Sequence, residues 1–120
     1  MNNLTEFAKQ VLSNTSSHVP SSVKDLISQF ILESNDMHIN SIEYFTNAIK
    51  ILAVTSQNTA LQYLFYFNGK DLIATATGAQ PTDEGIASLE FHIHTLSLAE
   101  VEQASDDQAF NDFIDKLYRD

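Results

Sequence analysis

Apolar residues in the first third of the chain recur at the spacing of amphipathic helices. The first set comprises Leu4, Phe7, Ala8, Val11 and Leu12, and the second comprises Val23, Leu26, Ile27, Phe30 and Ile31. Residues three and four apart share one face of a helix, so each set forms an apolar stripe. Asn3 with Glu6 suits the cap of the first helix, and the serines after Pro20 suit the start of the second. The polar linker 13–18 has an ordinary length for a connection between antiparallel helices.

A third helix is predicted after a polar loop at residues 34–40. Its main apolar stripe consists of Ile42, Phe45, Ile49, Leu52 and Ala53. Tyr44, Ile51 and Val54 widen this stripe beyond half of the circumference. A helix of that kind is typical of a central position, where two neighbours cover it.

From Thr59 onward the period becomes that of a strand. The alternating bulky residues are Leu61, Tyr63, Phe65 and Phe67. The dipeptide Asn68-Gly69 predicts a two-residue hairpin turn, because a type I′ turn needs positive φ at both central residues. In the resulting register Phe65 lies opposite Leu72.

This register divides the hairpin into a core face and a second face. The core face comprises Leu61, Tyr63, Phe65, Leu72, Ala74 and Ala76. The second face comprises Gln62, Leu64, Tyr66, Asp71, Ile73 and Thr75. The second face is half apolar, which is more than a solvated face needs, although scattered exposed apolar atoms are common.

A third strand is predicted after a surface loop at 78–85, in which Asp83 and Glu84 are interpreted as turn residues. Its inward residues are Leu89, Phe91 and Ile93, and its outward residues are Glu90, His92 and His94. This alternation is typical of an antiparallel sheet with one face covered by helices.

Two capping boxes precede the C-terminal segments. Ser97 with Glu100 opens a short helical turn, and Ser105 with Gln108 precedes a last helix. The apolar stripe of that helix is Phe110, Phe113, Ile114, Leu117 and Tyr118. The pattern predicts one two-layer α+β domain spanning 1–120, with three N-terminal helices packed on a three-stranded antiparallel meander and a C-terminal helix.

Composition narrows the classes of function. A hydrophobic content of 43% describes a globular chain rather than a disordered one. Sixteen acidic residues against six basic ones give a formal net charge of −10, which opposes binding to nucleic acid or to an anionic membrane. The chain has no cysteine, which excludes disulfides, thiolate metal sites and cysteine nucleophiles.

The first twelve residues mix polar and apolar side chains, which is not the pattern of an export signal. The longest apolar run is far shorter than the roughly 20 residues that span a bilayer. We therefore expect a cytoplasmic protein.

Catalytic motifs are sparse. Glu90, His92 and His94 alternate on one strand and could hold a divalent ion, but no other segment supplies an obvious further ligand. The polar outer face of a strand is the more favoured interpretation. No Gly-x-Ser-x-Gly elbow occurs, and the three glycines lie too far apart for a phosphate loop. We expect a protein that is not an enzyme and needs no cofactor.

The distribution of charge points to a protein partner. Residues 100–120 contain seven acidic and two basic residues, a net charge of −5. The candidate contact residues are Leu64, Tyr66, Asp71, Ile73, Asp106, Asp107, Asp112 and Asp115. An apolar centre with charges around it is the usual build of a specific interface.

The leading hypothesis is an acidic inhibitor or immunity-type protein that neutralises a basic partner, such as a toxin, a nuclease or an effector. One alternative is a small metal- or ligand-binding domain, or an enzyme, that uses the Glu-x-His-x-His face. Another is a structural homodimer associating through the half-apolar sheet face. A secretion chaperone is a further alternative, although its strands would come earlier in the chain than they do here.

Overall fold

A computed structural model describes residues 4–34, 37–56, 58–88 and 92–103 of the chain. The helices are α1 (Leu4–Asn14), α2 (Ser21–Leu32) and α3 (Leu98–Gln103). The strands are β1 (Met37–Tyr44), β2 (Ala48–Thr55), β3 (Ala60–Phe67), β4 (Asp71–Thr82), β5 (Gly85–Ser88) and β6 (His92–Ser97).

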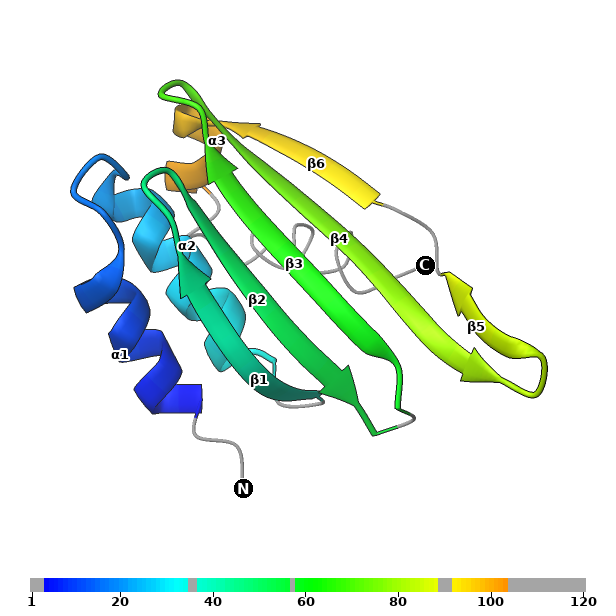
Figure 1. The fold of residues 1–120 in the computed structure, drawn as a ribbon. Coiled ribbons are helices and arrows are strands. Elements are labelled where there is room, and N and C mark those ends of the chain that lie inside the picture. Colours follow the sequence, from blue (N-terminus) through cyan, green and yellow to red (C-terminus); the bar gives the residue numbers. More distant parts are fainter. Residues whose placement is uncertain (1–3, 35–36, 57, 89–91, 104–120) are drawn as a thin grey trace.

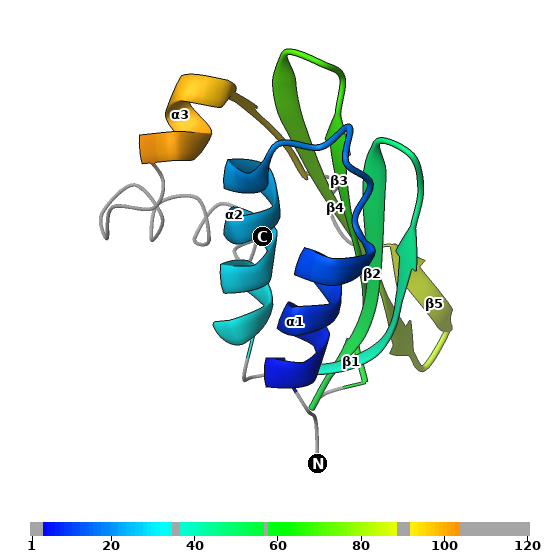
Figure 2. The ribbon, with the colours of Figure 1, turned by 90° about the vertical axis from the view of Figure 1, so that its left-hand side faces the viewer.

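The six strands form one antiparallel sheet in the order β1-β2-β3-β4-β5, and β6 also pairs with β4. The helices α1 and α2 are the predicted antiparallel neighbours (Figure 1). Seen from the side, the helices lie on one face of the sheet (Figure 2). None of the helices in the described ranges has the length and apolar content needed to cross a membrane.

The predicted third helix is wrong, because residues 42–54 belong to the β1–β2 hairpin. The register of this hairpin shifts between Ile39 and Ser41, so Asn40 is an extra residue in β1. This bulge separates the inward residues Ile39 and Ile42 by three positions, which imitates a helical spacing. In β2, Ile49, Ile51 and Ala53 are buried at the period of a strand. The β-branched residues here favour a pleated sheet over a helix.

The predicted loop at 78–85 is also wrong, because β4 extends to Thr82 and pairs with β5. The fold is therefore two helices, a six-stranded sheet and a short helix, instead of three helices on a three-stranded meander. The capping box is confirmed, since Ser97 and Glu100 each donate a backbone N–H to the other's side chain, at 2.9 and 3.2 Å. The predicted helix at 110–118 and its box at Ser105 lie outside the described residues.

The core lies between α1, α2 and the inner face of the sheet. All five residues predicted for the stripe of α2 are buried. The Phe30 ring packs edge-on against Tyr63 and Phe65, with centroid distances of 5.0 and 5.3 Å. Ser28 joins the two helices by donating its hydroxyl to the Ala8 carbonyl at 3.2 Å. These contacts fix the position of α2 relative to the inner face of the sheet and to α1.

The β3–β4 turn confirms the predicted hairpin but not its register. The Asn68 N–H donates to the Asp71 carbonyl at 3.1 Å, which makes Gly69 and Lys70 the two central residues. Gly69 has φ +96°, as the first central position of a type II′ turn requires. Phe67 therefore lies opposite Leu72, a displacement of two residues from the predicted register. Because side chains alternate with period two, every side chain stays on its predicted face.

Tyr44 ends β1 on the helix-covered face, opposite the buried Ile49. Its hydroxyl oxygen is buried and makes no hydrogen bond of good geometry within the described ranges. Burial raises the pKa of this hydroxyl above its ordinary value, and the nearby Asn14 side chain offsets part of the rise. The folded protein therefore keeps the phenolic proton to a higher pH than the unfolded chain.

The Tyr44→Phe variant should be as stable as wild type at pH 8, or more stable by up to about 1 kcal/mol, because it removes a buried hydroxyl without a good partner. Above pH 10 the wild type should lose stability as the unfolded chain releases the proton first, so the advantage of the variant should grow. Urea unfolding at pH 8 and pH 10.5 measures both values. Tyr66→Phe, at an exposed side chain, is the control. An advantage that does not grow with pH would contradict the assignment.

Candidate binding surface

The face of the sheet that points away from α1 and α2 carries a set of apolar side chains interspersed with polar ones, among them Lys50, Gln62 and Thr75. We call this set the outer patch, and it consists of Leu52, Val54, Leu64, Tyr66, Ile73 and Ile93. Tyr66 lies opposite Ile73, and Leu64 lies opposite Thr75, which lies opposite Ile93 on its other side. Side chains in such positions contact one another across neighbouring strands. The outer patch therefore crosses the middle of the sheet.

The side chains of the outer patch are partly or largely open to solvent. Ile93 is 61% exposed and Tyr66 is 41% exposed, while the other four members are partly exposed. In the side view, α1, α2 and α3 all lie on the opposite side of the sheet (Figure 2). Exposed apolar side chains that are grouped on one surface are a feature of interaction sites in soluble proteins.

Charge is scarce around the outer patch. Glu43 and Lys50 face each other across β1 and β2 and form an ion pair of 3.2 Å. Asp71, at the start of β4, is the other acidic residue on this face. The described ranges contain nine acidic residues, so seven of them lie elsewhere. Few of the described acids thus lie on this face, although the Glu43–Lys50 ion pair lies within it, with Lys50 directly opposite Leu64.

Four predicted contact residues come together here. Leu64, Tyr66, Asp71 and Ile73 all lie on the outer face of β3 and β4. The other four, Asp106, Asp107, Asp112 and Asp115, lie outside the described residues. The hairpin half of the predicted site is thus one surface, while its acidic half stays a prediction.

The predicted orientation of the third strand is wrong. Ile93 was expected to face the core, but it is 61% exposed, whereas Leu96 is 7% exposed and lies opposite the buried Leu72. The cause is one extra residue before β6. On β4, the partners of Ser88 and His92 are Ala79 and Ala76, which have two residues between them. Ser88 and His92 themselves have three residues between them, one more than a regular pairing with β4 allows. A single extra residue exchanges the two faces of a strand, and Leu96, which shares its parity with His92 and His94, was the available signal.

The same inversion changes the face on which His94 lies. His94 lies opposite the buried Ala74, on the helix-covered face rather than the outer one. His92 belongs to β6, and Glu90 lies outside the described residues. Within the described ranges no three His, Cys, Asp or Glu side chains are grouped so as to hold a metal ion.

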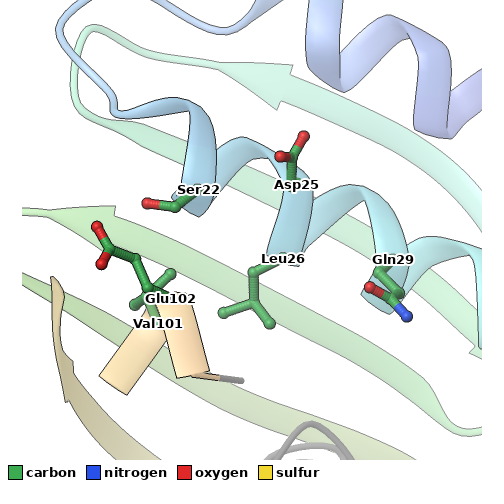
Figure 3. Close-up of a pocket in the computed structure, with 6 residues that line it drawn as sticks. All are labelled: Ser22, Asp25, Leu26, Gln29, Val101 and Glu102. Atoms are coloured by element: carbon green, nitrogen blue, oxygen red, sulfur yellow. The ribbon is translucent and has the colours of Figure 1, made fainter. Parts of the chain in front are cut away.

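A small pocket lies between α2 and α3, in the layer opposite the outer patch. It has a volume of about 170 Å³ and is lined by Ser22, Asp25, Leu26, Gln29, Val101 and Glu102 (Figure 3). Leu26 and Val101 are buried apolar side chains, and Asp25 and Glu102 are the acids. The lining contains no histidine or cysteine to act as a base or nucleophile. Its volume is below the roughly 300–1,000 Å³ of typical ligand sites.

Comparison of the chain with protein-family models, with curated proteins and with solved structures found no match. Of the two surfaces described above, the outer patch contains Leu64, Tyr66 and Ile73, which the sequence pattern singled out, and it includes the strongly exposed Ile93.

The orientation of β6 predicts unequal effects on stability when threonine replaces two nearby apolar residues. Leu96→Thr should lower the free energy of unfolding by roughly 2–5 kcal/mol, because it removes a buried side chain from the core. Ile93→Thr should change it by less than about 1 kcal/mol, because Ile93 is mostly in solvent and threonine suits a strand. Chemical unfolding of both variants provides the measurement. A larger loss at Ile93 than at Leu96 would mean that β6 faces the other way.

Proposed function

We propose that the chain is a non-enzymatic, cytoplasmic protein-binding module that docks a basic partner protein on the outer patch. This is the mode of action of a small acidic inhibitor or immunity-type protein. The observation that carries the proposal is the outer patch itself, in which six apolar side chains on four strands lie on the face opposite to α1, α2 and α3, the helices of the described ranges.

The outer face is large enough for a specific interface. Strands lie about 4.8 Å apart and rise about 3.3 Å per residue, so five strands of about seven residues cover roughly 550 Å² in projection. Side chains that stand up from the sheet make the accessible area larger than this projection. A specific complex of standard size buries about 800 Å² on each partner. The outer face and its rim therefore supply most of such a contact.

Charge and apolar contact have separate roles in this proposal. The net charge of −10 attracts a basic protein over a distance and speeds the encounter. The contact itself is made where acids are few, so that the partner does not bury unpaired carboxylates. Asp71 at the rim of the outer patch, together with the aspartates at 106, 107, 112 and 115, is proposed to provide the peripheral attraction.

The direct test places a photo-cross-linking amino acid, benzoylphenylalanine, in place of Tyr66 in the native host. The control places it at Leu12, which is 47% exposed on α1, on the opposite layer. Irradiation should link Tyr66, but not Leu12, to one protein of net positive charge, identified by mass spectrometry. A second copy of this chain at Tyr66, or the same proteins at both positions, would contradict the proposal.

The complex so identified allows a quantitative prediction. Tyr66→Ser should weaken binding by about tenfold or more, since tyrosines at the centre of an interface are frequent hot spots. Gln62→Ser, on the same strand and face, should leave Kd within about twofold, as substitutions outside the hot spot usually do. Raising salt from roughly 50 to 500 mM should weaken the wild-type complex, because screening shortens the reach of the charges. Binding that is independent of salt would remove electrostatic attraction from the account.

A further inference from the structure

The end of β4 and all of β5 form a two-stranded hairpin that extends beyond the main sheet. We call residues 79–88 the β4–β5 arm. β3 pairs with β4 only as far as Ala79, and from there to Thr82 the partner of β4 is β5. All residues from Pro81 to Ser88 are exposed. Both ribbon views show the arm at a corner of the sheet, away from the helices (Figures 1 and 2).

Ile86 is the most exposed large apolar side chain in the described ranges, at 79%. It lies opposite Pro81, which forms an apolar pair on one side of the arm. The pairing of β4 is continuous from Leu72 to Thr82, so Pro81 has the same parity as Ile73. The Pro81–Ile86 pair therefore lies on the same side of the sheet as the outer patch.

The arm is held by bonds of its own rather than by a core. The Thr82 hydroxyl donates to the Gly85 carbonyl at 2.9 Å and accepts the Glu84 N–H at 3.3 Å. Gly85 has φ +127°, a conformation that only glycine adopts without strain. An isolated two-stranded ribbon is marginally stable in water. The Pro81–Ile86 pair adds only the modest stability of a cross-strand contact, because Ile86 stays 79% exposed. The exposed Ile86 side chain is available to be buried against another surface.

The charge of the arm matches the proposed partner. Its turn contains Asp83 and Glu84, and the chain has no lysine or arginine between residues 71 and 88. An apolar side chain beside two carboxylates complements an apolar depression bordered by lysine or arginine. A second copy of this acidic chain would place like charges together at the same point.

We infer that the β4–β5 arm is a second contact element for the basic partner that binds the outer patch. Ile86 enters an apolar depression on the partner, and Asp83 and Glu84 pair with basic side chains next to it. This inference rests on the proposed function, because it assumes that one partner covers the arm and the outer patch together. It adds a contact that the sequence pattern assigned to a surface loop.

The test places benzoylphenylalanine at Ile86 in the native host, in parallel with the variant at Tyr66 and with a control at Leu32, which is 46% exposed on α2. The inference expects the same basic protein at Ile86 and Tyr66, and not at Leu32. If Tyr66 captures that protein and Ile86 captures nothing, or captures a second copy of the chain, the inference is overturned while the proposed function stands. If Tyr66 captures no basic protein, both are overturned.

A binding measurement with the captured protein separates contact from structure. Ile86→Ser should weaken the complex by about tenfold, the size expected for an apolar anchor, and leave Tm unchanged because the side chain lies outside the core. Ala87→Ser is the matched control, since Ala87 lies on the other side of the same strand, opposite Gln80. Equal affinity of the Ile86→Ser variant and wild type would overturn the inference. So would an equal loss from both variants, which would assign the effect to the conformation of the arm.

Discussion

The structure depends on the packing of α2 against the middle of the sheet. Phe30 makes edge-to-face contacts with Tyr63 and Phe65, and such aromatic pairs stabilise by about 0.5–1.5 kcal/mol beyond the area they bury. Because the described helices cover one face only, the inner side chains of β2, β3 and β4 form the core, and their neighbours on the same strands face outward. Among the described residues, the sheet therefore has one face covered by helices and one open face, and the functional proposal concerns the open one.

The period of two along a strand explains which predictions from the sequence hold. The β3–β4 register was predicted with an error of two residues, and this moved no side chain to the wrong face. One extra residue before β6 was not predicted, and Ile93 consequently lies on the face opposite to the expected one. The face of a strand is thus insensitive to even errors in register and completely sensitive to odd ones.

The bulge at Asn40 had a larger consequence, because it changed the kind of element that the pattern predicts. It places apolar side chains three positions apart in β1, and the apolar residues on both faces of β2 complete a pattern that resembles a helical stripe. The helices α1 and α2 contain no such interruption, and their stripes predicted them correctly. Extra residues in strands leave no unambiguous mark on hydrophobic spacing, so this part of the fold could not be derived from periodicity alone.

For the candidate surface, the sequence pattern identified the residues on the outer face of the β3–β4 hairpin and did not identify those on the other strands. Leu64, Tyr66 and Ile73 could be found because a half-apolar second face was visible in the pattern. Ile93 was hidden by the inverted face of β6, and Ile86 was missed because the strand pairing of 79–88 was not predicted and the segment 78–85 was assigned to a loop. In the proposed function, the acidity of the whole chain would speed the arrival of a basic partner, and the apolar outer patch would slow its dissociation.

The most direct test uses the absence of cysteine in the natural chain. A single cysteine replacing Ile93, and in a control chain Ser17 in the α1–α2 connection, can be labelled with a maleimide. Both should react rapidly in the purified protein, because both positions are exposed. In extract of the native host the account predicts that the cysteine at Ile93 becomes protected while the one at Ser17 does not. Equal labelling of the two in extract would show that nothing covers the open face of the sheet, and would contradict the account.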